Sequence, residues 1–217
     1  MKIISPSHEI LFMPDGETIL KSIESAGRTC YKSEDRITAD SAQGFVKGLL
    51  KSGHHSVIEH INITVRFICD RGVTHELVRH RLASYSQEST RYANYAKNKF
   101  GGEITVIQPM FWAEDTPEYR AWQAGMAFAE KTYLELIALG ARAEQARSVL
   151  PNSLKTEIVM TCNLREWRHI FELRCSRAAH PQIREIMFPL LKELRERLPV
   201  VFDDIYEKMN PEMRGAS

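Results

Sequence analysis

The stretch Ile61-Asn62-Ile63-Thr64-Val65-Arg66-Phe67-Ile68-Cys69 decides how this chain folds. From Ile61 to Cys69, apolar side chains alternate with Asn62, Thr64 and Arg66. A period of two is typical of a strand with one buried face. Residues 157–162 alternate in the same way and predict a second strand, and residues 1–4 predict a short one. The chain therefore builds a sheet from segments far apart in sequence.

Apolar residues at helical spacing predict helices between and after these strands. Asp40 and Asn163 are N-cap candidates, Thr74 is expected to cap a short helix ending near Arg81, and Gly140 is expected to end a long helix. Residues 84–98 are polar and aperiodic, which predicts a loop of the length that usually carries function. The expected helices are residues 17–29, a segment after Asp40, 74–81, 119–137, 143–149, 163–174 and 181–198.

Composition narrows the class of protein. With 43% hydrophobic and 26% charged residues in 217, the chain is typical of a folded globular protein, and we expect a single α+β domain over residues 1–217. Its sheet is expected to be mixed or antiparallel and flanked by helices. No apolar run approaches the roughly 20 residues that span a bilayer, and the start lacks the apolar core of a secretion signal. We expect a soluble cytoplasmic protein with reduced cysteines and no membrane partner.

The charged residues suggest an anionic small molecule as ligand. The 29 basic and 28 acidic residues leave a net charge of +1, which argues against a nucleic-acid-binding module. The basic residues comprise 18 arginines and only 11 lysines. Arginine offers a planar fork that pairs with phosphate or carboxylate groups.

Histidine clusters raise the possibility of a metal site. His54, His55 and His60 lie near the segment His75-Glu76-Leu77-Val78-Arg79-His80. Zinc-binding histidines on one helix need a spacing of four, whereas His75 and His80 are five apart and diverge by about 140°. We therefore expect no metal, and hydrogen bonding at a turn and a strand end explains His55 and His60 better.

Other catalytic and nucleotide-binding motifs are missing from the sequence. It has no GxSxG, GxGxxG or GxxxxGK[ST] motif, so neither a nucleophile elbow nor a Rossmann or P-loop site is supported. Cys69 and Cys162 lie on predicted strands and are expected to be core residues. Any cofactor must therefore be held by side chains.

Polar chemistry concentrates between Arg79 and Tyr92, where 14 residues include three arginines, a histidine, three serines and a glutamine. If this segment were helical, Arg79 and Arg81 would point about 200° apart, so one ligand could not easily be gripped by both. This arrangement suggests a site shared between subunits. A solvated, arginine-rich helix end is the alternative.

The same segment resembles a known family. Arg79-His80-Arg81, seven residues and then Ser89 reproduce the RHRx7S motif of flavin-dependent thymidylate synthases. Residues 53–60 resemble the family's GHxSxxEH element, with Val57 where many members have proline. Arg147 with Leu150-Pro151, Asn163-Leu164-Arg165, and Leu173-Arg174 resemble three further elements in the family's order. The similarity extends over about residues 28–186.

The resemblance implies a homotetramer of mixed α/β fold, with active sites at subunit interfaces. It implies synthesis of dTMP from dUMP, with 5,10-methylenetetrahydrofolate as carbon donor, FAD as hydride carrier and NADPH as reductant. A related dUMP hydroxymethylase is the alternative. The residues implied around FAD are His54, Ser56, Arg79, His80, Arg81, Gln87, Asn163, Leu164, Arg165 and His169. Those implied around dUMP are Glu76, Leu77, Val78, Arg79, Gln87, Glu88, Ser89, Thr90, Arg91, Arg147 and Arg174.

The family's chemistry implies a role for Arg174. Family members polarise the pyrimidine electrostatically instead of adding a thiolate to it. We expect the Arg174 guanidinium to favour negative charge on the ring, because it stays protonated. Ser89 is then a binding residue, and His169 could instead line the core.

Overall fold

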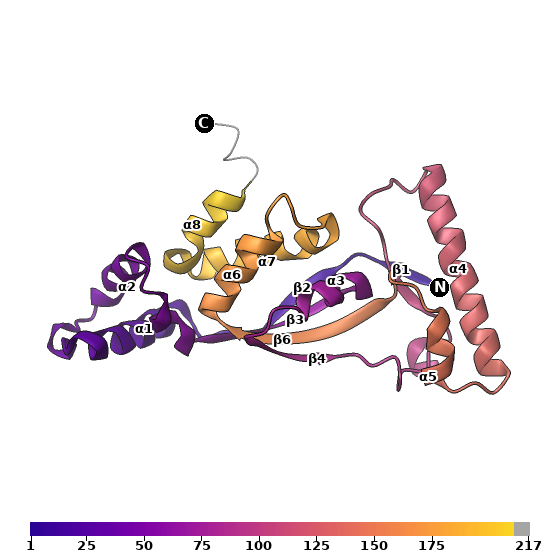
Figure 1. Cartoon of the computed structure of the whole chain (residues 1–217), viewed down its shortest axis with the longest axis horizontal. Coiled ribbons are helices and arrows are strands. Elements are labelled where there is room, and N and C mark those ends of the chain that lie inside the picture. The colour runs from indigo at the N-terminus through magenta and orange to yellow at the C-terminus, as the bar shows by residue number, and fades with distance from the viewer. Residues whose placement is uncertain (211–217) are drawn as a thin grey trace. The chain divides into compact units, whose positions relative to one another are not determined.

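The computed structural model describes residues 1–210, and Figure 1 shows the order of its elements. Contacts divide the chain into two compact units, each assembled from separate segments. Unit 1 comprises Met1–His8, Arg66–Arg79 and Tyr85–Val159. Unit 2 comprises Glu9–Val65, His80–Ser84 and the C-terminal stretch from Met160. The expectation of a single domain stays a prediction.

Four strands form the main sheet in the order β2-β3-β6-β4. Their bounds are β2 Ser7–Phe12, β3 Asn62–Asp70, β6 Lys155–Asn163 and β4 Ala83–Gln87. Leu164 N donates to Ile61 O at 2.9 Å, and the hydroxyls of Thr64 and Thr161 are 2.9 Å apart, so β3 and β6 run antiparallel. β1 (Lys2–Ile4) pairs in parallel with β5 (Thr105–Ile107) in a second sheet. The alternation predicted for β3 and β6 is confirmed, whereas β2 and β5 were not predicted.

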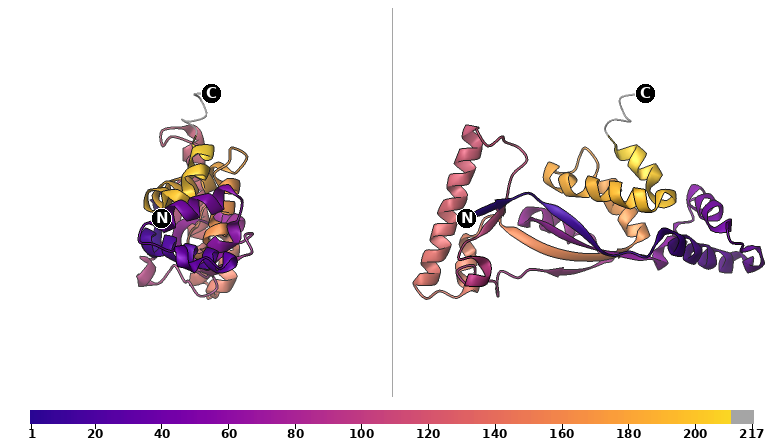
Figure 2. Two further views of the ribbon diagram at one scale, coloured as in Figure 1. Left: turned by 90° about the vertical axis from the view of Figure 1, so that its left-hand side faces the viewer. Right: turned by 180° about the vertical axis from the view of Figure 1, so that it is seen from behind.

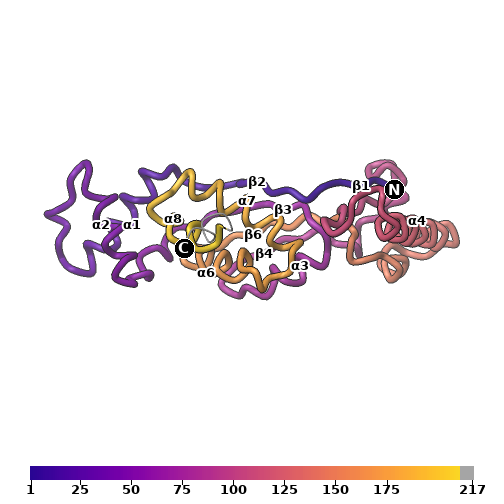
Figure 3. The backbone as a smooth tube through the Cα atoms, turned by 90° about the horizontal axis from the view of Figure 1, so that it is seen from above, coloured from indigo at the N-terminus to yellow at the C-terminus, as the bar shows by residue number. Residues whose placement is uncertain are grey.

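Unit 2 holds the helices α1 (Gly16–Tyr31), α2 (Ser41–Lys51), α6 (Leu164–Arg174), α7 (Pro181–Arg197) and α8 (Pro199–Met209), with the short 3-10 turns η1 (Glu34–Arg36) and η2 (His55–His60). Figure 2 shows α6, α7 and α8 grouped together, and Figure 3 shows α1 beside α2. The buried Trp167 joins α6 to β3, since its Nε1 donates to Ile63 O at 3.2 Å and its ring stacks on Phe171.

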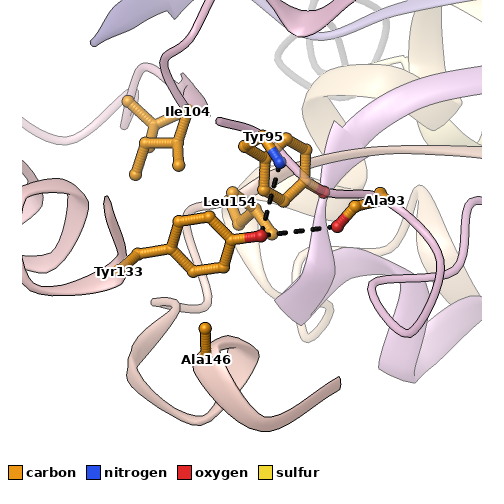
Figure 4. Packing of buried hydrophobic residues seen from close by; sticks show 7 residues of the cluster. Ala93, Tyr95, Ile104, Tyr133, Ala146 and Leu154 are labelled. Carbon is orange, nitrogen blue, oxygen red and sulfur yellow. Dashed lines mark hydrogen bonds between the residues drawn. The ribbon is translucent and has the colours of Figure 1, made fainter. Parts of the chain in front are cut away.

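Unit 1 contains α3 (Arg71–Leu77), η3 (Asn98–Phe100), α4 (Pro117–Ala138), α5 (Ala143–Ala146) and η4 (Arg147–Val149). Its core is built around Tyr133 of α4, which is fully buried. The Tyr133 hydroxyl accepts from Tyr95 N at 3.3 Å and donates to Ala93 O at 3.5 Å, as Figure 4 shows. These bonds satisfy the polar end of a large buried ring and tie residues 93–95 to α4.

Glycines end two of the helices. Gly53 and Gly140 adopt positive φ angles of 77° and 94° directly after the last helical turns. His54 N donates back to Leu49 O and Ala141 N to Leu136 O, the six-to-one bonds of Schellman ends. Asp40 occupies the N-cap position of α2, but its side chain makes no capping hydrogen bond.

The helix expected over residues 74–81 was placed wrongly. α3 is Arg71–Leu77, and its cap is Asp70, whose Oδ1 accepts from Val73 N at 2.7 Å. Thr74 instead donates its hydroxyl to Arg71 O inside the helix. Arg79 and Arg81 are therefore not helical, and the divergence calculated for a helix does not describe them.

Two further expectations need correction. Residues 84–98 are not all loop, because β4 covers Ala83–Gln87. The side chains of β4 that face inward include the polar Gln87. The sequence of β4 therefore does not show the alternation of apolar and polar residues that predicts a strand. The C-terminal helical region also continues beyond residue 198, because Pro199 starts α8 at a first-turn position that needs no amide hydrogen. Within residues 1–210, no helix is both long and apolar enough to cross a bilayer.

Candidate functional site

His80 is the central residue of the site in unit 2. It is only 5% exposed, and its Nε2 lies 3.0 Å from Nε of Arg174, which donates to it. On the other side of the ring, Nδ1 lies 3.5 Å from Oε1 of Glu166. Burial, with the nearby Arg174 and His169 charges, lowers the pKa of His80 to about 4. The imidazole is therefore neutral at pH 7, and its proton is assigned to Nδ1, facing the Glu166 carboxylate.

α6 supplies three of the groups around this imidazole. Asn163 starts the helix, since its Oδ1 accepts from Glu166 N at 2.9 Å. Glu166 and His169 follow one turn apart, and the His169 ring packs edge-on to His80 with centroids 6.2 Å apart. Arg174 stands in the last turn of the same helix. A helix fixed by its cap thus orients both the carboxylate and the guanidinium that grip His80.

Other site residues predicted in unit 2 lie on its surface. His54, Ser56, Arg81, Arg165 and His169 are exposed. Arg165 NH1 pairs with Glu59 Oε1 at 2.5 Å, which joins the NxR element to the GHxSxxEH element. His54 borders a groove of about 720 Å³ that Arg28, Lys32 and Arg36 also line.

Leu164 differs from its neighbours. Its side chain is fully buried, and its amide donates to Ile61 O.

The residues implied for the nucleotide lie mainly in unit 1. Gln87 Nε2 donates to the hydroxyls of Thr74 at 3.0 Å and Thr156 at 3.3 Å. Both threonines are almost fully buried, at 1% exposure. Two hydrogen bonds to rigid partners thus fix the direction of the Gln87 side chain where β4 ends.

The residues after Gln87 form a short polar turn. Arg91 N donates to Ser89 Oγ at 3.3 Å, and Arg147 NH1 donates to Thr90 Oγ1 at 3.4 Å. Arg91 is exposed, and its Nε lies 3.9 Å from Oε2 of Glu144. Hydroxyl groups and two guanidinium groups together suit an anionic phosphate.

The remaining predicted residues border this turn. Oε2 of Glu88 lies 3.1 Å from Nζ of Lys155, and the two form an ion pair. Glu76 is half-buried, Leu77 is buried with its carbonyl accepting from the Tyr85 hydroxyl, and Val78 and Arg79 are exposed. Of these side chains, those of Val78 and Arg79 are therefore open to a ligand, whereas that of Leu77 is buried.

Sequence reasoning missed Glu166 and Lys155, which pair with the predicted site residues His80 and Glu88. Glu166 lies between the motif residues Asn163 and His169, so its position on α6 was the available signal. Lys155 lies in no motif. Among residues 1–210, no group of three or more His, Cys, Asp or Glu side chains could hold a metal ion.

The family model for the thymidylate synthase complementing proteins matches residues 13–200. The chain belongs to this family. The flavin-dependent thymidylate synthase of Pyrococcus abyssi is 37% identical over 167 residues, covering 76% of this chain and 68% of the relative. The enzyme of the same name from Geobacter sulfurreducens is 32% identical over 198 residues, covering 88% and 82% of the two chains. The resemblance inferred from the RHRx7S motif is confirmed.

A solved structure has a similar fold. The UMP/dUMP methylase PolB from Streptomyces cacaoi, bound with 5-Br dUMP, superposes with a TM-score of 0.74 at 24% identity. The match covers 94% of this chain and 96% of PolB. The expected mixed α/β architecture with an antiparallel sheet is thereby confirmed.

Proposed function

We propose that this chain is a flavin-dependent thymidylate synthase, which reductively methylates dUMP to dTMP. One observation carries the proposal: within a chain of this family, the neutral His80 of the RHRx7S motif holds Arg174 by a 3.0 Å hydrogen bond. The carbon donor is 5,10-methylenetetrahydrofolate, the hydride carrier is FAD and the reductant is NADPH. The reaction takes place in the cytoplasm.

The donor chemistry of the predicted flavin residues fits FAD. Arg81, Arg165 and His54 are exposed and can pair with a pyrophosphate, as can Arg79, while Ser56 offers a hydroxyl. Asn163, Gln87, His169 and the Leu164 main chain complete the proposed set, and His80 adds a buried neutral ring. When bound, FAD supplies the hydride transfer that no side chain can perform.

In the nucleotide site, the turn after β4 holds the phosphate of dUMP. Ser89 and Thr90 offer hydroxyl groups and Arg91 offers a guanidinium group, and Arg147 donates to Thr90. Glu76, Leu77, Val78, Arg79, Gln87 and Glu88 border the nucleotide. Arg174 acts on the uracil ring: its permanent positive charge favours negative charge on the pyrimidine without removing a proton itself.

The assembly proposed for this activity is a homotetramer with its active sites at subunit interfaces. Sedimentation of the flavin-loaded protein should give four chains per particle. Interface variants that remain folded as monomers should lose FAD, and a monomer that retains FAD as tightly would contradict a shared site.

The deciding experiment combines a spectrum with a product assay. The purified protein should show flavin absorption, directly or after addition of FAD. With dUMP, NADPH and 5,10-methylenetetrahydrofolate it should release dTMP, identified by mass spectrometry. A hydroxymethylated product would assign the chain to the related hydroxymethylases. Absence of flavin binding and of any product would contradict the proposal.

A further inference from the structure

Lys155, the first residue of β6, lies between two carboxylates in unit 1. Its Nζ is 3.1 Å from Glu88 Oε2 and 2.7 Å from Glu157 Oε1, and its side chain is only 20% exposed. Burial works against the ammonium, but hydrogen bonds and charges from Glu157 and Glu88 outweigh it and raise the pKa of Lys155. Lys155 is therefore charged at neutral pH.

Glu88 directly follows β4, and its side chain is held on the face that Lys155 occupies. Its amide donates to Glu157 O at 2.8 Å, which keeps the chain extended beside β6 beyond the end of β4. Its Oε1 accepts from the Tyr95 hydroxyl at 3.4 Å. Successive side chains of an extended chain point to opposite faces, and Gln87 accordingly bonds to Thr74 and Thr156 instead.

This arrangement fixes a negative charge directly before the proposed phosphate-binding turn of Ser89, Thr90 and Arg91. A carboxylate so close in sequence lies within about one Debye length, roughly 8 Å at physiological salt, of an anion bound there. Unneutralised, it would repel the phosphate of a nucleotide. Lys155, which also pairs with Glu157, is the cation that offsets it: with Lys155 the three side chains carry one net negative charge, and without it they would carry two.

We propose that Lys155 is a positioning residue for the nucleotide phosphate: by pairing with Glu88 it removes the repulsion that this carboxylate would exert on dUMP. The inference rests on the proposed function and adds to it a residue outside all the family's motifs quoted above. Lys155 acts through Glu88 and does not itself touch the substrate.

A charge-pair cycle tests this inference in the flavin-loaded protein. Lys155→Met should weaken dUMP binding about three- to tenfold at low salt, measured by titration calorimetry. The loss should shrink at high salt, and binding of deoxyuridine, which has no phosphate, should not change. The double variant E88Q/K155M should bind dUMP more tightly than Lys155→Met, because the repelling charge is gone.

Matched controls separate this effect from net charge and from folding. Lys131→Met removes an exposed lysine on α4 of the same unit and should leave dUMP affinity unchanged. Lys155→Arg should retain the affinity. If Lys155→Met fails to fold, Lys155→Gln removes the same charge with a polar side chain and should weaken dUMP binding by the same factor at low salt.

The outcomes distinguish this inference from the proposed function. Equal dUMP affinity in Lys155→Met and the unaltered protein, or no recovery in E88Q/K155M, would overturn the role of Lys155 while leaving the proposed function intact. An equal loss of deoxyuridine binding would reduce Lys155 to a structural residue. Failure of the unaltered protein to bind dUMP at all would overturn both.

Discussion

Nε2 of His80 accepts a hydrogen bond from Nε of Arg174 across 94 residues of sequence, with the two atoms 3.0 Å apart. An acceptor at Nε2 requires an imidazole without a proton on that nitrogen. The low pKa of His80, about 4, maintains this state at neutral pH. The direction of the Arg174 guanidinium thus depends on the protonation of a buried histidine.

Arg174→Lys should separate flavin reduction from methylation. Lysine keeps the charge but loses the planar fork and the Nε that bonds to His80. We expect dTMP formation at saturating dUMP to fall about 10²- to 10³-fold, the usual effect of removing one preorganised charge-stabilising donor. Flavin reduction by NADPH should change far less. Near-normal dTMP release would refute the role of Arg174, and an equal loss of both rates would place the residue in the flavin site.

The stability of the protein should depend on pH through His80. The folded state keeps this imidazole neutral down to a pKa of about 4, whereas the unfolded chain protonates it near 6.5. Between these values only the unfolded state binds the proton, so the free energy of unfolding falls as the pH falls from about 6.5 to about 4. From pH 7 to pH 5, the unaltered protein should lose about 1–2 kcal/mol more than His80→Gln, which cannot titrate. Urea unfolding at pH 7 and pH 5 measures this difference. An equal change in the free energy of unfolding for the two proteins would contradict the prediction.

Gly27 should not tolerate alanine, because α1 and α2 approach closely there. A Cβ at Gly27 would lie 2.7 Å from Phe45 Cε1 and 2.9 Å from Leu49 Cδ1. Gly27→Ala should lower the free energy of unfolding by about 1–3 kcal/mol. Gly44 on α2 is the matched control, since a Cβ there meets nothing within 4 Å. Gly44→Ala should stabilise by about 0.5–1 kcal/mol in the same urea titrations; a stable Gly27→Ala would refute the close packing.

The cysteines should be dispensable for catalysis. Burial raises the pKa values of Cys69 and Cys162, and raises that of Cys175 to about 12, whereas Cys30 is exposed. One thiol should therefore react quickly with iodoacetamide in the folded protein, and mass spectrometry should place the label on Cys30. Folded single Cys→Ser variants should keep dTMP synthesis within about tenfold. Complete loss of activity in a flavin-loaded variant would show that a thiolate takes part.

The elements with strong local patterns could be predicted from the sequence. β3, β6 and α4 show their periodicity within the segment itself, and Asn163 is followed directly by a helix. The error at α3 arose because Asp70 and Thr74 are both good caps four residues apart. Choosing between them requires knowing where β3 ends. β4 was missed because its inward Gln87 is satisfied by two threonines, one of them 69 residues away.

Only the site residues that lie in sequence motifs could be predicted. The RHRx7S and LR elements named His80 and Arg174, but the hydrogen bond between them exists only in the folded chain. Glu166 and Lys155 are ordinary charged residues in sequence. Their roles depend on a buried imidazole and on Glu88, which the fold brings to them.

The interleaving of the two units has a consequence for synthesis on the ribosome. Unit 1 is complete once Val159 has emerged, whereas α1 and α2 belong to a unit that also needs α6, α7 and α8. α2 packs against α8, and Trp167 reaches β3 only after residue 167 has been made. At about 5–20 residues per second, α2 waits roughly 7–30 s for α8. During that time α1 and α2 can pack on each other and α1 on η2, but the face of α2 that meets α8 stays exposed for most of the synthesis.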